Sequence, residues 1–204
     1  TVPKNKRMQY LSIVSQEMQR LKILISSMLN LTKFDNGTIE IHYQLFPIQD
    51  LAFRTILMFE SRLEKRNITL EGLDSEPVQV WGDPDLIGQV IYNLFENATK
   101  FVNTGGTITF TFKDEPNNTS IAIRNTGAGI SKEELPKIFE RFYKSDDSRS
   151  HDKTGLGIGL DITKHIVRLH KAQISVSSEE GEYTEFLIRL PKKDAPAESP
   201  TENP

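Results

Sequence analysis

The sequence predicts an α+β fold, a two-layer sandwich in which helices cover one face of a mixed, mainly antiparallel sheet. Segments with helical spacing of apolar residues and segments with strand-like alternation follow one another along the chain, which is typical of separate helical and sheet layers. Short turn sequences join several of the alternating segments, as in hairpins. One long amphipathic segment precedes them, and 204 residues are enough for one core with such an appendage.

The N-terminal segment predicts one amphipathic helix over residues 6–34. Its apolar positions alternate by three and four, as in a heptad seam, at Leu11, Val14, Met18, Leu21, Ile25 and Met28. Because a lone helix cannot bury this seam, we predict either dimerisation through the helix or a hairpin whose first helix is absent from this chain. A helix folded back onto its own domain is the alternative. The turn sequence at 35–37 marks a domain boundary.

The elements after this boundary follow from the same patterns. Single strands are predicted at 38–46, 68–73 and 78–81, and a helix at 47–66. Two hairpins are predicted, the first from strands 107–113 and 120–124 and the second from strands 173–178 and 184–190. Residues 192–204 are too polar and proline-rich to form a packed structure of their own.

The helix predicted over residues 83–102 organises the rest of the chain. Asp83 and Pro84 provide a capping carboxylate and a proline at the first helical position. One stripe of the helix is apolar and predicts the face packed on the sheet: Ile87, Ile91, Leu94, Ala98 and Phe101. A second strip runs along its flank and is polar: Gln89, Asn93, Asn97 and Lys100.

The polar strip indicates a ligand site. Asparagine is a mediocre helix former, so something other than helix stability is expected to keep Asn93 and Asn97 there. Polyphosphate with Mg²⁺ would explain the choice, because this hard ion accepts a neutral amide oxygen when phosphates supply the negative charge. Lys100 would meet phosphate oxygen as a point charge. A solvated polar face is the alternative.

Two glycine-rich segments follow this helix. NTGAGI at 125–130 comes after a predicted strand, and GLGIG at 155–159 opens a helix whose buried face carries Ile158, Ile162, Ile166 and Leu169. Bare backbone N–H groups and a helix N-terminus both favour phosphate. Between the two segments, a short helix ending at 139–143 and a polar stretch at 144–153 are predicted to form a lid.

Composition and missing motifs exclude several classes. The net charge is −3 without a long basic run, which argues against a nucleic-acid partner. The absence of cysteine excludes disulfides, thiolate catalysis and Cys-ligated zinc. No apolar run reaches the roughly 20 residues that span a bilayer, and an upstream membrane segment stays open. The glycine spacing matches neither a dinucleotide fingerprint nor a P-loop.

Four motifs together resemble the N, G1, F and G2 boxes of bacterial two-component sensor histidine kinases. In order they are NLFENATKF at 93–101, NTGAGI at 125–130, FERFY at 139–143 and GLGIGL at 155–160. Residues 20–37 also resemble the second helix of that family's dimerisation domain. The resemblance implies that residues 1–36 belong to this helix, that 37–191 form a Bergerat-type ATP-binding catalytic domain, and that 192–204 are a disordered tail.

The resemblance also implies roles for individual residues. Asn97 would hold Mg²⁺, Asn93 would contact phosphate or a metal-bound water, and Lys100 and Lys144 would meet phosphate. Tyr143 would flank the nucleotide, and Asn93, Lys100 and Lys144 would carry the catalysis. The remaining cofactor-binding residues implied by the boxes are Asn125, Gly127, Gly129, Ile130, Gly155, Leu156, Gly157, Ile158 and Gly159. Thr184 resembles a threonine on a late strand of the family that supports the adenine site.

Several positions depart from the family pattern. The G1 box usually begins with an aspartate that accepts a hydrogen bond from adenine, whereas Asn125 accepts without charge assistance, and weaker ATP binding is expected. The usual glycines are replaced by Lys171, Ala172 and Tyr183. None of the histidines fits the phosphoacceptor pattern: His42 lies in the predicted strand at 38–46, His151 lies in the predicted lid, and His165 and His170 lie on the helix that the second glycine-rich segment opens.

The predicted function is therefore the catalytic region of a sensor histidine kinase. It would transfer the γ-phosphoryl group of Mg-ATP to a histidine outside this chain, for relay to an aspartate of a response regulator receiver domain. The expected partners are this regulator and a second copy, with no nucleic acid, and the expected location is the cytoplasmic portion of a membrane sensor. One alternative is a non-catalytic nucleotide-binding or scaffold module with weakened affinity. Another is a chaperone-type or mismatch-repair-type ATPase, for which Asn93 is a poor general base.

Overall fold

The computed structural model describes residues 39–144 and 157–193, together with Val14, Met18, Leu21 and Ile25 of the N-terminal segment. The chain divides into two compact units, Thr1–Glu40 and Ile41–Pro204, which are treated separately below. Within the described part of the chain, no helix is long and apolar enough to cross a membrane.

In the first unit, the four described residues are helical and belong to the predicted seam. Their side chains are between 50% and 68% exposed, at spacings of four, three and four residues. Exposed apolar side chains at heptad spacing are typical of a helix that packs against a partner helix. The other residues of the predicted helix lie outside the described part, so helix-mediated dimerisation stays a prediction.

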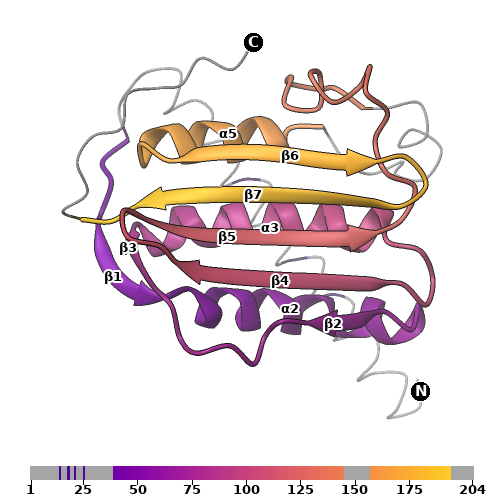
Figure 1. Ribbon diagram of the computed structural model, residues 1–204, viewed down its shortest axis with the longest axis horizontal. Helices are drawn as coiled ribbons and strands as arrows, with labels where there is room; N and C mark the ends of the chain where they lie inside the picture. Colours follow the sequence, from indigo (N-terminus) through magenta and orange to yellow (C-terminus); the bar gives the residue numbers. More distant parts are fainter. Residues whose placement is uncertain are drawn as a thin grey trace. The chain divides into compact units, whose positions relative to one another are not determined.

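The second unit is built on a five-stranded sheet with the strand order β2-β4-β5-β7-β6 (Figure 1). In chain order these strands are β2 (Thr69–Glu71), β4 (Thr107–Asp114), β5 (Asn118–Thr126), β6 (Gln173–Glu179) and β7 (Tyr183–Pro191). Only the β2–β4 pair is parallel among these neighbours, and the other three pairs are antiparallel. The mixed, mainly antiparallel sheet and both predicted hairpins are thereby confirmed.

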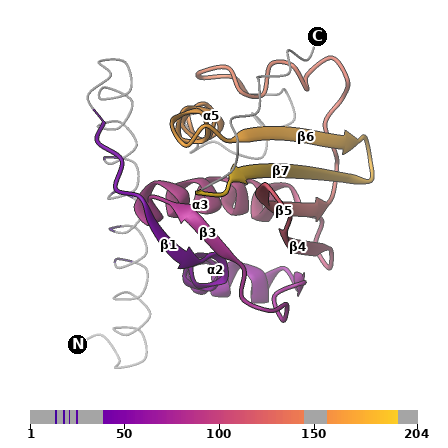
Figure 2. The same cartoon turned by 60° about the vertical axis from the view of Figure 1, so that its left-hand side comes forward.

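A separate two-stranded sheet joins β1 (Gln44–Pro47) to β3 (Gln79–Gly82) (Figure 2). The pair lies beside the starts of two helices, because β1 leads into one and β3 into the other. The predicted strand at 38–46 is wrong in extent, since residues 39–43 are outside any strand. The backbone N–H of His42 donates to Oδ2 of Asp83 at 2.9 Å instead of joining a strand ladder.

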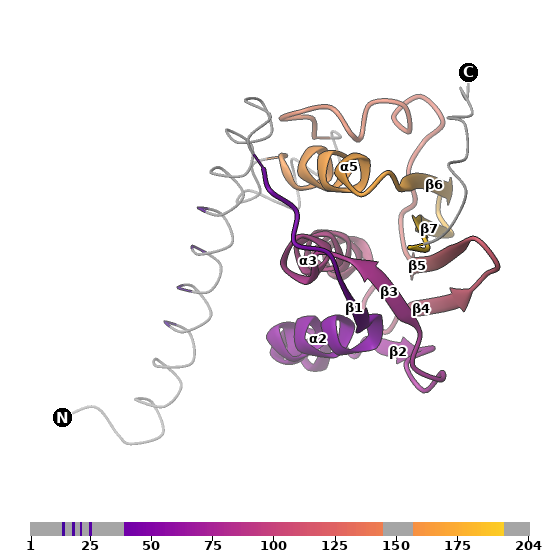
Figure 3. The same cartoon turned by 90° about the vertical axis from the view of Figure 1, so that its left-hand side faces the viewer.

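Three helices cover one face of the large sheet (Figures 1 and 3). They are α2 (Ile48–Lys65), α3 (Pro84–Phe101) and α5 (Gly159–Leu169). Between the layers, Phe95 of α3 lies with its ring centroid 5.4 Å from that of Phe59 in α2 and 5.5 Å from that of Phe110 in β4. These large rings fill the middle of the core, as the two-layer prediction requires.

Helix α3 has the predicted cap and the predicted core stripe. Oδ1 of Asp83 accepts from the backbone N–H groups of Asp85 at 3.0 Å and Leu86 at 3.1 Å. Ile87, Ile91, Leu94 and Ala98 are 3% exposed or less, whereas Phe101 at the last position is only half-buried. Burial extends further around the helix than one stripe, because α3 contacts α2, α5 and the sheet.

His170, just after α5, ties this helix to the start of α3. The residue is 2% exposed. Nδ1 lies 2.8 Å from the carbonyl oxygen of Ile166, and Nε2 accepts from the backbone N–H of Asp83 at 3.0 Å. This pairing requires a neutral ring with its proton on Nδ1. Burial lowers the pKa of His170, against the opposing effects of the Ile166 carbonyl and the Asp83 carboxylate.

Two local predictions differ from the structure. The short helix expected to end at 139–143 is a series of turns, beginning with the N–H groups of Glu134 and Leu135, which both donate to the carbonyl of Ser131 at 3.1 Å. In α5, Ile158, Ile162 and Ile166 are buried as predicted. Leu169 is only half-buried because the helix ends there, and Val167 occupies the core in addition.

Candidate functional site

The polar strip of α3 is less exposed than a solvated helix face. Asn93 is 6% exposed, and Gln89, Asn97 and Lys100 are half-buried. Nζ of Lys100 lies 3.3 Å from Oε1 of Glu96 on the preceding turn, an ion pair that keeps the ammonium close to the helix. The strip therefore presents amides and a cation at the border of the core.

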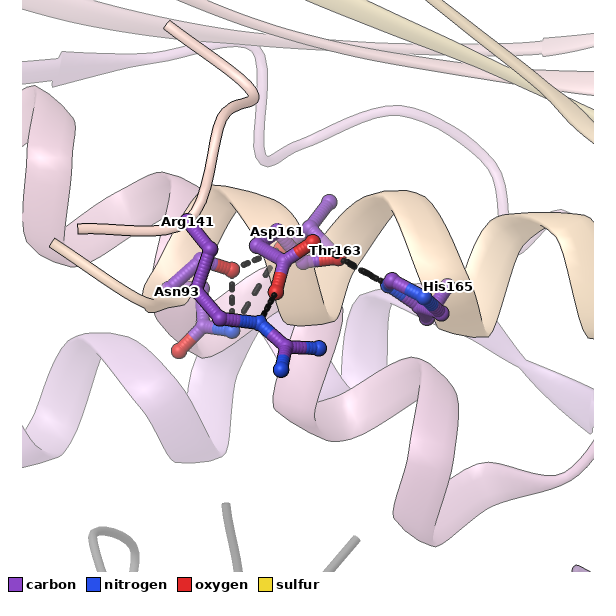
Figure 4. Close-up of polar contacts among 6 residues, drawn as sticks. Asn93, Arg141, Asp161, Thr163 and His165 are labelled. Atoms are coloured by element: carbon purple, nitrogen blue, oxygen red, sulfur yellow. Dashed lines mark hydrogen bonds and ion pairs between the residues drawn. The ribbon is translucent and has the colours of Figure 1, made fainter. Parts of the chain in front are cut away.

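Asn93 is fixed by the first turn of α5 (Figure 4). Its Nδ2 group donates to the carbonyl oxygen of Gly159 at 3.0 Å and to Oγ1 of Thr163 at 3.3 Å. Oγ1 of Thr163 donates in turn to the same carbonyl at 2.9 Å. Because the Gly159 carbonyl and the Thr163 hydroxyl both engage Nδ2, Oδ1 is the atom of this amide that a ligand can use. The second glycine-rich segment thus ends directly beside the amide strip.

The first glycine-rich segment starts inside β5, not after it as predicted. Asn125 is 4% exposed, and its Nδ2 group donates to the carbonyl of Thr126 at 3.1 Å. In the ladder, Asn125 faces Thr184 of β7, so the structure brings these two predicted residues together. This leaves the amide oxygen of Asn125 as its acceptor, with no charge on the group.

Ser178 connects the loop after β5 with Thr184. The backbone N–H of Ile130 donates to Oγ of Ser178 at 2.8 Å, and this Oγ lies 3.0 Å from Oγ1 of Thr184. The hydroxyl also donates to the carbonyl of Tyr183 at 2.6 Å. Sequence reasoning missed Ser178, because an ordinary serine in a strand carries no signal of this contact.

Gly127 and Gly129 are required by close packing of the backbone. A Cβ atom on Gly127 would overlap the carbonyl oxygen of Phe101, and one on Gly129 would overlap that of Glu179. Gly129 also has a φ of +70°, which L side chains rarely adopt. The loop therefore packs closely between the end of α3 and the turn after β6. A side chain at Gly127 or Gly129 would displace it.

The segment before the second glycine run contacts Gly157, which leads into α5. The backbone N–H of Phe142 donates to the carbonyl of Gly157 at 2.9 Å. The hydroxyl of Tyr143 donates to Oε1 of Glu134 at 3.4 Å, and Tyr143 and Lys144 are half-buried. Gly157, with a φ of +69°, leaves room for the carbonyl of Tyr143.

Some predicted site residues stand apart from these contacts. Ile158 is 6% exposed, so its side chain belongs to the core. Gly155, Leu156 and the predicted lid beyond Lys144 lie outside the described residues, as does His151.

An ion pair on α5 was also missed. Oδ2 of Asp161 lies 2.9 Å from Nε of Arg141, and its Oδ1 lies 3.2 Å from Nδ1 of His165. The four-residue spacing of Asp161 and His165 was the available signal for the second contact, since such residues are neighbours on a helix. The Arg141 contact joins residues 20 positions apart, and no local pattern predicts it.

The oxygen ligands available at this site suit a hard cation whose positive charge is balanced mainly by the phosphates of a bound ligand. Within the described residues, no three side chains from His, Cys, Asp and Glu gather into a metal-binding group. The oxygens that the strip offers are those of the amides, as a magnesium ion shared with a polyphosphate accepts. The strip places amides and the Lys100 ammonium beside the N-terminus of a helix that begins with glycine, which is the chemistry of an anionic, phosphate-bearing ligand.

Residues 82–194 match the family model described as histidine kinase-, DNA gyrase B- and HSP90-like ATPase. The chain therefore belongs to this family of nucleotide-binding domains. The chain is 32% identical over 185 residues to the sensor protein SrrB of Staphylococcus aureus strain NCTC 8325. This similarity covers 90% of the chain but 32% of SrrB, so the chain spans about a third of the length of that relative.

Solved structures show the same fold. The nucleotide-free catalytic domain of the histidine kinase ThkA is 28% identical, with a TM-score of 0.64 over 74% of this chain and 96% of that domain. The histidine kinase AdeS of Acinetobacter baumannii is 22% identical, with a TM-score of 0.69 over 95% of this chain and 88% of AdeS. The predicted fold class and the resemblance to a sensor histidine kinase ATP-binding domain are confirmed.

Proposed function

We propose that this chain is the ATP-binding catalytic part of a sensor histidine kinase. It positions ATP so that an imidazole nitrogen attacks the γ-phosphorus. A nitrogen–phosphorus bond forms while the bond to the leaving ADP oxygen breaks. Such a transfer depends on positioning and charge neutralisation more than on covalent chemistry by the protein.

The observation that carries this proposal is the contact between Asn93 and the first turn of α5. It brings the N-terminus of a glycine-led helix against the amide strip, although Asn93 and Gly159 are 66 residues apart in sequence. A helix N-terminus attracts phosphate through its free N–H groups, and the strip supplies oxygens for the accompanying cation. Lys100 and Lys144 then neutralise phosphate charge.

Magnesium fits the residues that are present. Asn97 would hold the ion, and Oδ1 of Asn93, facing away from the Gly159 contact, would meet a phosphate or a metal-bound water. Bound there, the ion would neutralise the charge of the phosphate oxygens. The protein's own contribution is to fix the Asn93 amide and to exclude water from the core.

The phosphoacceptor histidine and the partners lie outside this chain in the proposal. His170 is buried and bonded on both nitrogens, and His165 contacts Asp161, so neither is presented for phosphoryl transfer. A solved complex joins the kinase ThkA with the response regulator protein TrrA, at 23% identity to this chain. By analogy, the final acceptor is a receiver-domain aspartate. The description of the relative SrrB as a sensor protein supports a membrane-associated parent whose cytoplasmic portion includes this domain. The exposed apolar seam at Val14, Met18, Leu21 and Ile25 supports a homodimer formed through the 6–34 helix.

The experiment that tests the proposal is titration calorimetry with the non-hydrolysable analogue AMP-PNP, with and without Mg²⁺. We expect Mg²⁺-dependent binding to the wild-type chain and a loss of about tenfold or more in Asn97→Ala, because one metal ligand is removed. Asn103→Ala, an exposed amide beyond the end of α3, is the matched control and should bind as the wild type does. An affinity that changes neither when Mg²⁺ is omitted nor in Asn97→Ala would refute the proposed site.

A second candidate function rests on Asn125. This buried amide stands where the family usually has an adenine-binding aspartate, and its hydrogen bond to Thr126 leaves a neutral acceptor. A nucleotide site weakened in this way would suit a scaffold that no longer transfers phosphate. Titration of the Asn125→Asp variant distinguishes the catalytic domain from the scaffold. If the wild type does not bind AMP-PNP and Asn125→Asp does, the scaffold is favoured.

A further inference from the structure

The first turn of α5 is a junction of two elements that reach the candidate site from opposite parts of the sequence. Asn93 of α3 donates to Gly159 and Thr163, and Arg141 of the segment before the second glycine run pairs with Asp161 (Figure 4). Asp161 therefore lies on the same turn that orients the Asn93 amide.

The Asp161 carboxylate is held on both oxygens. Oδ2 lies 2.9 Å from Nε of Arg141, and Oδ1 lies 3.2 Å from Nδ1 of His165, which also contacts the Asp161 carbonyl oxygen at 2.9 Å. The Asp161 side chain is 9% exposed and that of Arg141 is 37% exposed. A carboxylate in the first turn of a helix also interacts favourably with the helix dipole. The buried Asp161 carboxylate is thus the fixed member of the pair, and it restrains the more exposed Arg141 side chain.

Phe142 shows why this pair matters for the backbone. It has a φ of +66°, a conformation that is unfavourable for a bulky residue and persists only where the surroundings impose it. Burial of its side chain does not impose it, because Phe142 is 69% exposed. Two contacts lie at this position: the Arg141–Asp161 ion pair and the hydrogen bond from the Phe142 N–H to the Gly157 carbonyl.

We propose that Asp161 is a positioning residue for nucleotide binding, acting through Arg141. By holding Arg141 against α5, it keeps Phe142 in its unfavourable conformation and thereby places Tyr143 and Lys144 beside the helix turn that fixes Asn93. This inference rests on the proposed function, because Tyr143 and Lys144 are the residues expected to meet the nucleotide.

The experiment is a double-mutant cycle in the whole chain, with Arg141→Ala, Asp161→Ala and the double variant. For each protein, the dissociation constant of AMP-PNP with Mg²⁺ and the free energy of unfolding in urea are measured. We expect each single variant to weaken binding about fivefold and the double variant to bind no more weakly than the single ones, since coupled neighbours are non-additive. Arg141→Lys, which keeps the charge, should recover part of the affinity.

The matched control is Arg168→Ala, which removes an exposed arginine from the same helix and should leave the dissociation constant unchanged. If the wild type binds AMP-PNP and every variant has the same dissociation constant, the inference is overturned and the proposed function stands. Losses of affinity that add in the double variant would also overturn it, because the two residues would then act separately. Absence of binding by the wild type at millimolar nucleotide would refute the proposed function and the inference with it.

Discussion

At the scale of single residues, the structure depends on side chains that connect elements distant in sequence. His170 is the clearest case, because its buried ring bonds the last turn of α5 on one nitrogen and the N–H of Asp83 on the other. Asn93, Ser178 and Asp161 make comparable connections around the candidate site. Asn93, Asp161 and His170 are buried, which is tolerable for polar groups only because they are hydrogen-bonded.

The lowered pKa of His170 predicts a loss of stability in mild acid. The folded protein favours the neutral ring, so the unfolded chain binds more protons below its ordinary pKa of about 6.5. The stability contributed by the neutral ring is fully present above about pH 6.5 and is lost as the pH falls through the lower, folded pKa. The free energy of unfolding in urea, measured at about pH 7.5 and about pH 5.5, checks this.

In this measurement, His170→Gln should show a smaller decrease between the two pH values than the wild type, whatever its absolute stability. His42→Gln, at an exposed position, is the control and should behave as the wild type. Equal decreases in the wild type and His170→Gln would show that another group causes the acid sensitivity.

At the scale of elements, α3 is the helix on which both the core and the candidate site depend. One face buries Ile87, Ile91 and Leu94, and the adjoining strip carries Asn93 and Asn97. A shift of this helix would therefore move the site and open the core together. Its position is fixed at the N-terminus by Asp83, which is 6% exposed and bonds three backbone N–H groups.

Loss of this cap should destabilise the whole domain. Asp83→Ala removes the acceptor for the N–H groups of Asp85 and Leu86, and such a loss costs about 1–2 kcal/mol of unfolding free energy. Asp83→Asn keeps an acceptor and should cost less. Asp85→Ala, which removes an exposed acid from the same turn, is the matched control. A urea unfolding curve for Asp83→Ala that coincides with that of Asp85→Ala would contradict the capping role.

Most elements of the second unit were predictable, because hydrophobic period and turn chemistry are local. The cap at Asp83, the core stripe of α3 and both hairpins follow from residues near one another in sequence. Pairing between distant segments was not predictable in this way: β2 lies parallel to β4, and β1 pairs with β3 in a sheet of its own. Alternation shows that a strand exists but not which strand is its neighbour.

The candidate site shows the same division. The strip on α3 and the glycine segments are visible in the sequence, and the fold brings Asn93 to Gly159 and Asn125 to Thr184. The supporting residues were not visible, because Arg141 and Asp161 are ordinary charged residues until the chain folds. Phe142 was expected at the end of a short helix, whereas its positive φ belongs to a turn that tertiary contacts impose.

At the scale of the whole molecule, the chain combines a domain of the ATPase family with an N-terminal seam of exposed apolar residues. Val14, Met18, Leu21 and Ile25 belong to the first unit, and the family match begins at residue 82. The chain spans about a third of the length of its relative SrrB.

The central claim is that ATP binds along the polar strip of α3, and backbone amide chemical shifts test it most directly. On addition of AMP-PNP and Mg²⁺, we predict the largest changes at residues 93–100, 125–130, 141–144 and 157–163, where the strip, both glycine segments and α5 meet. Unchanged shifts at these positions, or changes centred instead on the groove of α2 and β2 lined by Ile56, Leu57 and Leu70, would contradict the account.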